Sequence, residues 1–225
     1  FSPALCFGRN EKFRICTPSH RITFKKLNAS SSMADYAPEF TLAHALNVTK
    51  ETSFWCLVGM CGILLVDVLY ASRFKARYFV CHTIINAIIT LLVLQDSWWL
   101  LSDPLGALEH KSCSNVPLGL VFAIHFYHMI GAFVPKKYGG FKLYYVDWLH
   151  HILMVVLGCP AIMFAAMGPT VNFNFLFVCG IPGGLDYFML VRVKEGLMKP
   201  LEEKRINTLV NFTFSWTIGR LLFFF

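Results

Sequence analysis

The amino-acid sequence predicts an all-α protein, a multi-pass bundle of transmembrane helices. Of its 225 residues, 56% are hydrophobic and only 15% are charged, whereas soluble domains carry about 25% charged residues. The apolar residues gather in blocks of about 20, the length that an α-helix needs to cross a bilayer. This composition excludes a soluble enzyme, a disordered protein, a collagen or coiled-coil rod and a small disulfide scaffold.

Six apolar blocks are long enough to be spans. They cover residues 54–72, 78–101, 116–134, 146–166, 170–191 and 206–225. The sixth block is the most polar, since it includes Asn207, Asn211 and Arg220. The sequence stops inside this block, at Phe225, so we expect that the carboxyl terminus is truncated and that at least one further helix follows.

The amino-terminal segment, residues 1–32, differs from the rest of the chain. It carries six basic residues and one acidic residue, hence +5 of the total charge of +7, and the first methionine is Met33. It lacks the apolar region of a secretory signal peptide. An organelle-targeting segment, the remnant of a longer amino-terminal region and translated upstream sequence all fit it, and we favour the last. We therefore predict that residues 1–32 lie outside the folded protein, that residues 33–53 form a non-cytosolic tail, and that residues 54–225 form the membrane domain.

The loops between the predicted spans differ in charge. The first, third and fifth loops together carry eleven lysine and arginine residues, whereas the second and fourth carry only Lys111. Because short cytosolic loops are enriched in these residues, we predict that the odd loops are cytosolic and that the amino terminus is not. This distribution of charge also predicts no nucleic-acid partner. The glycosylation sequon Asn47-Val48-Thr49 lies on the predicted non-cytosolic side.

Polar residues within the spans share one depth. Counted at about 1.5 Å per residue, they lie roughly 6–14 Å from the cytosolic face of a hydrocarbon core about 30 Å thick. This polar layer consists of Asp67, His82, His125, His128, Asp147, His150, His151, Asp186 and Asn211. Ionisable residues are costly inside a membrane and by default indicate a functional site. We therefore predict a polar cavity that opens toward the cytosol.

Spacing along each helix groups these residues into sets. His125 and His128 are three residues apart, and Asp147 precedes His150 and His151 by three and four residues, so each set can face one side of its helix. An aspartate one turn before a histidine can accept its ring N–H and raise its basicity. One member of the histidine pair is then a candidate general base, and the other a substrate or partner contact. The alternatives are an interfacial anchor at Asp147 and the pair, and a structural hydrogen bond from His125 to a neighbouring helix.

The polar layer supplies two sets of predicted site residues. The predicted catalytic residues are His82, His128, Asp147, His150 and His151. The predicted substrate-binding residues are Asn86, His125, Asp186, Tyr187 and Asn211.

We predict neither a resident cofactor nor a metal site from the sequence. The histidines at positions 125, 128, 150 and 151 resemble the histidine boxes of membrane desaturases and hydroxylases, but no box is complete. A single zinc or iron site would need three or four converging ligands. The sequence permits such a site without requiring it.

The fifth span contains residues that interrupt a regular helix. Pro182 removes a backbone hydrogen bond, and Gly180 and Gly184 form a GxxxG pair that permits close helix contact, including contact between two copies of the chain. Such a break is tolerated where it lines a cavity or is buried in protein. A kink that serves packing alone is the alternative. The basic segment 192–205 follows, where lipid phosphates or a nucleotide-bearing acyl donor would approach.

The stretch from about Arg77 to Tyr187 resembles the TLC-domain family, which includes ceramide synthases and smaller lipid-regulating membrane proteins. The motifs that carry the resemblance are Arg77-Tyr78-Phe79-Val80-Cys81-His82, Asp96, Asp103-Pro104-Leu105 and Asp147-Trp148-Leu149-His150-His151-Ile152. His128 stands near the family's intramembrane aspartate. The acidic tract that follows the paired histidine in ceramide synthases is not recognisable, which favours the non-synthase branch. The resemblance implies a bundle of six or more helices in the endoplasmic reticulum that acts on or senses lipids.

We therefore expect a multi-pass membrane protein that acts on or regulates membrane lipids. If it is an enzyme, it is a lipid acyltransferase in which the paired histidine removes a proton from an amine or hydroxyl while the basic loop holds acyl-CoA as co-substrate. The alternative is a non-catalytic carrier of lipids or small molecules, a channel or a membrane assembly factor. A histidine-box metalloenzyme is the third hypothesis.

Overall fold

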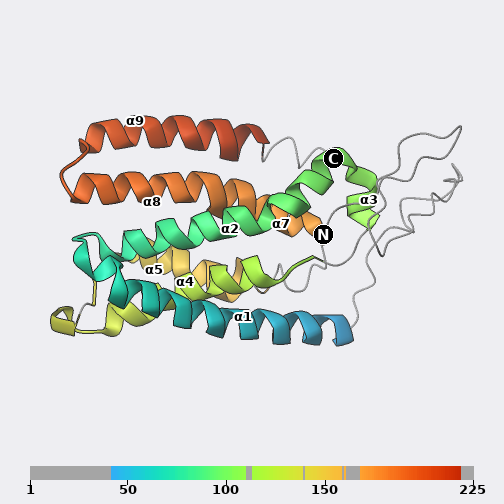
Figure 1. The fold of residues 1–225 in the computed structure, drawn as a ribbon, viewed down its shortest axis with the longest axis horizontal. Helices are drawn as coiled ribbons and strands as arrows, with labels where there is room; N and C mark the ends of the chain where they lie inside the picture. Colours follow the sequence, from blue (N-terminus) through green and yellow to red (C-terminus); the bar gives the residue numbers. More distant parts are fainter. Residues whose placement is uncertain (1–41, 110–112, 139, 159, 161–167, 219–225) are drawn as a thin grey trace, which may run out of the picture. The chain divides into compact units, whose positions relative to one another are not determined.

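The structure, a computed structural model, describes residues 42–109, 113–138, 140–158, 160 and 168–218. Contacts divide the chain into two units, and all of these residues belong to the second, Pro38–Phe225. Every regular element in these ranges is helical, which confirms the all-α class (Figure 1). The prediction for residues 1–32 lies outside the described residues, as do the ends of the predicted fourth and sixth spans, at 161–166 and 219–225.

The described helices follow one another through short loops. The α-helices are α1 (Leu42–Leu69), α2 (Arg77–Ser102), α3 (Pro104–Glu109), α4 (Val116–Phe133), α5 (Tyr145–Ile152), α7 (Pro169–Phe175), α8 (Ile181–Lys194) and α9 (Pro200–Val210). Three π-helical segments directly continue α5, α7 and α9, namely η4 (Leu153–Gly158), η5 (Leu176–Gly180) and η6 (Asn211–Ile218). Two 3-10 segments, η2 (Ala71–Arg73) and η3 (Lys136–Tyr138), lie in loops.

Four helices among the described residues are long and apolar enough to cross a membrane. They are Leu42–Arg73, Arg77–Ser102, Val116–Phe133 and Pro169–Lys194, which correspond to the first, second, third and fifth predicted spans. The six predicted spans are therefore not all confirmed. The predicted fourth span is described only as the shorter apolar helix Tyr145–Gly158. The predicted sixth corresponds to α9 and η6, and α9 begins with the polar sequence Pro200-Leu201-Glu202-Glu203-Lys204-Arg205.

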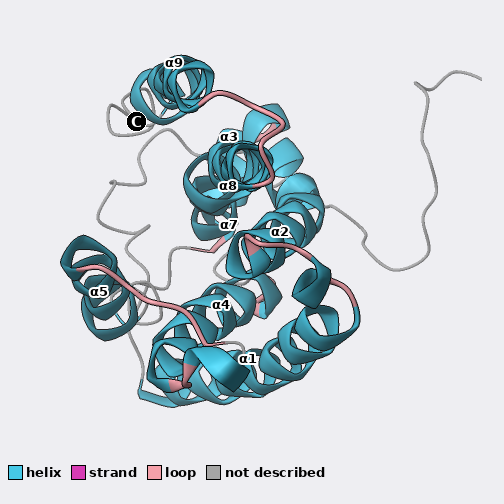
Figure 2. Cartoon of the chain, turned by 90° about the vertical axis from the view of Figure 1, so that its left-hand side faces the viewer, coloured by secondary structure: helices cyan, strands magenta, loops and turns pink. Residues whose placement is uncertain are grey.

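Helix α2 has the central position among the described helices. It contacts α4 on one side and α7, η5 and α8 on the other, while α1 packs along α4 and α9 packs along α8 (Figure 1). Helix α5 and its continuation η4 lie beside α4 (Figure 2). This order brings the polar faces of α2, α4 and α5 next to one another.

Small residues allow α1 and α4 to approach closely. A Cβ atom added at Gly59 of α1 would lie 2.9 Å from the Cβ of Ala123, and one added at Gly119 of α4 would lie 2.6 Å from the Cβ of Trp55. Each helix therefore presents a glycine where the other presents a side chain. Such contacts are typical of helix association in membranes, where packing rather than water exclusion holds helices together.

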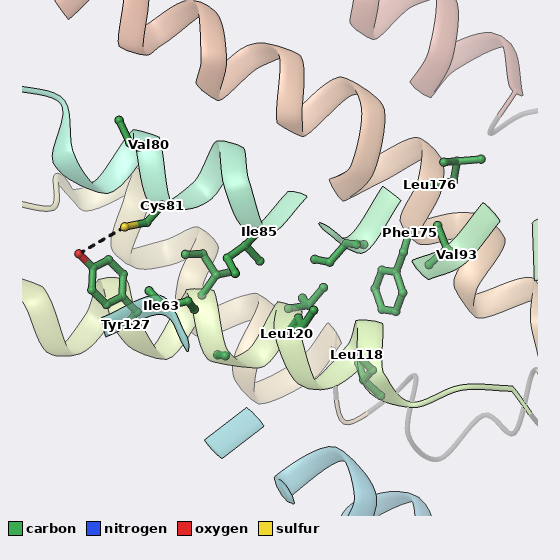
Figure 3. Close-up of a cluster of buried hydrophobic side chains, with 14 of the residues drawn as sticks. Ile63, Val80, Cys81, Ile85, Val93, Leu118, Leu120, Tyr127, Phe175 and Leu176 are labelled. Atoms are coloured by element: carbon green, nitrogen blue, oxygen red, sulfur yellow. Dashed lines mark hydrogen bonds between the residues drawn. The ribbon is translucent and has the colours of Figure 1, made fainter. Parts of the chain in front are cut away.

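The core between the helices is apolar, and so is the outer surface. Ile63, Ile89 and Val93 are fully buried and pack with side chains from α4 and α7, and the Cys81 thiol lies 4.0 Å from the Tyr127 hydroxyl (Figure 3). Large apolar side chains also cover the outside, and they include Leu65, Leu91, Trp98, Phe133 and Val156. An apolar exterior of this extent is unusual for a protein in water but suits contact with lipid chains. The exterior therefore supports an integral membrane protein.

Three loops lie together at one end of the described helices, which we call the basic end. The backbone N–H of Lys75, between α1 and α2, donates to the carboxylate of Glu195, which follows α8, at 2.7 Å. Phe141, between α4 and α5, stacks on Tyr78 at the start of α2 with a centroid distance of 4.9 Å. The lysine and arginine residues that we assign to the odd loops lie in these loops or in the helix ends next to them. The turn after α8 is tight because Gly196 adopts a positive φ of 77°, which glycine accommodates without strain.

Candidate functional site

Buried polar side chains concentrate near the basic end. Five histidines from three helices meet there: His82 of α2, His125 and His128 of α4, and His150 and His151 of α5. Four of them are buried, and His150 is the exposed member. The structure therefore brings together all of the histidines of the predicted polar layer.

The inner part of this cluster is a triad of His82, His128 and His151. The Nδ1 atom of His128 lies 3.1 Å from Nε2 of His82 and 2.8 Å from Nε2 of His151. One ring nitrogen from each of the three residues lies within 4.8 Å of the others. Each ring comes from a different helix, so the triad forms only when α2, α4 and α5 pack together.

The start of α5 determines how its histidines are held. The carboxylate of Asp147 accepts the backbone N–H of Tyr144 at 2.9 Å, which caps the first turn of the helix. The ring of His151 donates instead to the backbone carbonyl of Asp147, with Nδ1 at 2.6 Å from the oxygen. Asp147 therefore orients His151 as the spacing suggests, but through its main chain rather than through its carboxylate. Because Nδ1 carries the proton, Nε2 of His151 presents a lone pair to His128.

The outer part of the cluster is the pair His125 and His150. The Nδ1 atom of His125 donates to the backbone carbonyl of Val121 at 2.7 Å, so its Nε2 atom carries a lone pair. This lone pair faces Nε2 of His150 at 3.4 Å. The contact requires the proton of a neutral His150 to be on Nε2, which leaves Nδ1 as its basic nitrogen. His150 thus combines exposure with a defined tautomer.

Aromatic side chains surround the triad. The ring of Tyr187, from α8, stacks on His82 with a centroid distance of 3.8 Å and an angle of 3° between the planes. Tyr78 and Phe141 contact His128 edge to face, with centroid distances of 5.3 and 5.7 Å. These contacts fix the planes of two of the three rings. Tyr187 is thus the one predicted substrate-binding residue of α8 that touches the cluster.

Other predicted site residues have different partners. Asp186 accepts a hydrogen bond from Asn207 of α9 at 2.7 Å, and Asn211 donates to the side-chain oxygen of Asn207. These residues join α8 to α9 and have no described contact with the histidines. Asp67 of α1 forms a bidentate ion pair with Arg77 at the start of α2.

Asn86 packs against the glycine-rich start of α8. A Cβ added at Gly183 would lie 3.0 Å from its amide nitrogen, and one added at Gly184 would lie 3.5 Å from its Cβ. A Cβ added at Gly180 would lie 2.8 Å from the hydroxyl of Thr90. The GxxxG pair thus packs on α2 of the same chain, and self-association through it stays a prediction.

Sequence reasoning missed two groups of residues. The first is the aromatic set Tyr78 and Phe141, which surrounds the triad; Tyr78 stands in the motif that begins at Arg77, but no sequence signal places either ring against the histidines. The second is Glu203 and Asn207, which bond to each other at 3.3 Å in the interface with α8. Their signal was present, because positions 203, 207 and 211 are four residues apart and so share one face of a helix. Glu203 is only 2% exposed.

The cluster can accept positive charge but cannot hold much of it without a partner. Two protonated imidazoles 2.8 Å apart would repel each other strongly in a buried site. The described hydrogen bonds of the five rings go to one another and to backbone carbonyls, not to carboxylates. The geometry suits either a mobile proton or a single cation.

No family model, curated protein or solved structure matches the chain. The likeness to TLC-domain proteins therefore depends on the motif residues given above.

Proposed function

We propose that this integral membrane protein transfers an acyl group from a thioester donor to the amine or hydroxyl of a membrane lipid, as its likeness to TLC-domain proteins implies, with His150 as general base. The observation that carries the proposal is the pair His125–His150. His125 holds the inner nitrogen of His150, and the outer nitrogen of an exposed ring stays free to take a proton. The endoplasmic reticulum is the proposed location on the same resemblance.

The reaction needs few protein groups. Nδ1 of His150 removes the proton from the lipid nucleophile as its nitrogen or oxygen attacks the acyl carbonyl carbon. The carbon–sulfur bond of the donor then breaks, and the departing thiolate takes the proton from the imidazolium. The new amide or ester and the free thiol are the products, and His150 returns to its neutral form.

The basic end supports a donor that carries phosphates. Arg73, Lys136 and Lys142 lie in loops at this end, Arg192 and Lys194 lie in the last turn of α8, and the contacts of Lys75 and Phe141 hold the three loops of the basic end together. Phosphate groups bind where basic side chains gather at a membrane surface. An acyl-CoA bound there would place its thioester near the histidines.

The test compares His150→Ala with Leu149→Ala, a change in the adjacent, exposed and apolar residue of α5. Both variants and the wild type are reconstituted at equal amounts with labelled acyl-CoA and a mixture of membrane lipids, and the lipids of cells that express them are profiled. Loss of a general base lowers a rate by about 10²- to 10⁴-fold, so His150→Ala should lose transfer while Leu149→Ala retains it.

An unchanged lipid profile and no transfer by the wild type would refute the proposal. Flux of lipid across proteoliposomes that persists in His150→Ala would instead favour the alternative, a non-catalytic carrier.

A further inference from the structure

We infer that His82, His128 and His151 form a binding site for one divalent transition-metal ion, with zinc as the best fit. The inference goes beyond acyl transfer, because it depends on the geometry of the triad alone. Three neutral imidazoles are a recognised ligand set for zinc, which then keeps a fourth position open.

The first argument is convergence. Three ring nitrogens from three helices meet. Nδ1 of His128 lies 2.8 Å from the ring nitrogen of His151 and 3.1 Å from that of His82, and all three atoms lie within 4.8 Å of one another. Around a tetrahedral zinc ion with Zn–N bonds of about 2.0–2.1 Å, ligand nitrogens lie about 3.3 Å apart. The two hydrogen-bonded pairs therefore need to separate by only a few tenths of an ångström, and the third pair, at up to 4.8 Å, needs to move closer by no more than about 1.5 Å.

The second argument comes from counting protons. Because Nδ1 of His151 donates to the Asp147 carbonyl, its Nε2 offers a lone pair to Nδ1 of His128. If Nδ1 of His128 carries a proton, that single proton serves His82 and His151 together. If it carries a lone pair, two lone pairs oppose each other at 2.8 Å. A cation can take the place of this shared proton, since it accepts a lone pair from all three rings.

The third argument is the support around the rings. A metal-binding histidine usually donates its other N–H to an oxygen, which fixes its tautomer and orientation. His151 does so through the Asp147 carbonyl at 2.6 Å. The plane of His82 is fixed by Tyr187, which is stacked at 3.8 Å, and that of His128 by Tyr78 and Phe141. The triad is thus held in position before any ion arrives.

The ligand set also indicates what the open position would take. Three neutral ligands leave the full charge of the ion in place, so an oxygen with negative character is the preferred fourth ligand. Water, a lipid hydroxyl or the carbonyl oxygen of an acyl group meets this requirement. His125 and His150 lie next to the site, with ring centroids 5.1 and 5.3 Å from that of His151, and can accept a proton from such a ligand.

The test measures metal on the purified full chain in detergent. After incubation with zinc and removal of the excess, elemental analysis should find about one zinc per wild-type chain. His128→Ala should weaken zinc binding by more than about 100-fold, because changes of residues that merely support a ligand already cost 10- to 100-fold. His150→Ala, a change next to the triad, should retain the metal.

Cobalt provides a readout that does not depend on a loss of binding. Co²⁺ in the wild type should give the visible ligand-field absorption of a tetrahedral site. In His151→Cys, a thiolate ligand should add a sulfur-to-cobalt charge-transfer band in the near ultraviolet, which no purely structural role of His151 predicts. Folded wild-type protein that holds no zinc and gives no cobalt spectrum would overturn the inference. These experiments need no substrate, so zinc binding without acyl transfer would refute only the proposed function.

Discussion

Gly119→Ala tests the packing of α1 on α4, the helix that carries His125 and His128. Gly119 lies against α1, and the added methyl group would meet the Cβ of Trp55 at 2.6 Å and the backbone nitrogen of Cys56 at 3.0 Å. Neither atom is the end of a flexible side chain. The contact can therefore be relieved only if the two helices move apart.

The expected size of the effect follows from these distances. Carbon atoms in contact are usually 3.5–4.0 Å apart, so α1 must retreat by about 1 Å. Overpacking of this kind typically costs about 1–3 kcal/mol. Gly62→Ala, on α1, is the matched control, because a Cβ at Gly62 meets nothing within 4 Å. Both variants exchange glycine for alanine within a helix. The effect of helix propensity therefore largely cancels when the stabilities of the two variants are compared.

Thermal unfolding in detergent measures this difference. At about 2–4 °C per kcal/mol for a chain of this size, Gly119→Ala should unfold about 2–12 °C below Gly62→Ala. Equal midpoints for the two variants would refute the close approach of α1 and α4. A lower midpoint for Gly62→Ala would also contradict it, since that glycine lies in open space.

Two further predictions concern charged and titratable groups. Asp67→Asn should lower the free energy of unfolding by about 3 kcal/mol, because Asp67 is buried and its carboxylate forms the bidentate ion pair with Arg77. Arg77→Gln added to Asp67→Asn should lower that free energy little further. If the effects of the two substitutions are additive in this double-mutant cycle, the ion pair does not stabilise the protein. Burial raises the pKa of the Cys113 thiol from 9.0 to about 12, with a contribution from the charge of Asp96. A raised pKa means that less of the thiol is thiolate at neutral pH, although a more basic thiolate is also a better nucleophile. With both effects included, Cys113 should react with maleimide about 50-fold more slowly in the folded than in the unfolded protein. Equal labelling rates in the two states would contradict the burial of this thiol.

The helices were the part of the fold that composition and length could predict. Apolar blocks gave four helices of spanning length because a bilayer fixes the minimum length of such a helix. Their ends were less predictable. The first span was predicted from residue 54, yet α1 begins at Leu42. Hydropathy marks where a helix meets lipid, whereas the polar first turns of α1 are held by other contacts, such as the bond from Asn115 to Glu51 at 2.7 Å.

The depth of the polar residues in the membrane was predictable, but the neighbouring helix that each of them faces was not. Depth follows from counting residues along a span, and on that basis Asp186 and Asn211 belong with the histidines. The structure turns Asp186 toward α9 instead, and Asn211 bonds within its own helix, to the same Asn207 that holds Asp186. The rotation of α8 depends on its glycine contacts with Asn86 and Thr90, and such contacts are not visible in one sequence. The partner of the Asp147 carboxylate was not predictable either. We expected it to accept a histidine N–H, but it accepts the backbone N–H of Tyr144 at the start of α5.

The geometry of an α-helix gives the two adjacent histidines of α5 different roles. Successive residues on an α-helix point about 100° apart, so His150 and His151 cannot both face one ligand. The structure follows this rule: His151 is 4% exposed and contacts His128 within the triad, while His150 is exposed and faces His125. A pair of this kind can supply a metal ligand on one side and a proton acceptor on the other. His150→Ala should then lose transfer with the metal retained, while His151→Ala should lose the metal; loss of metal in each variant would show that the pair acts as one ligand set.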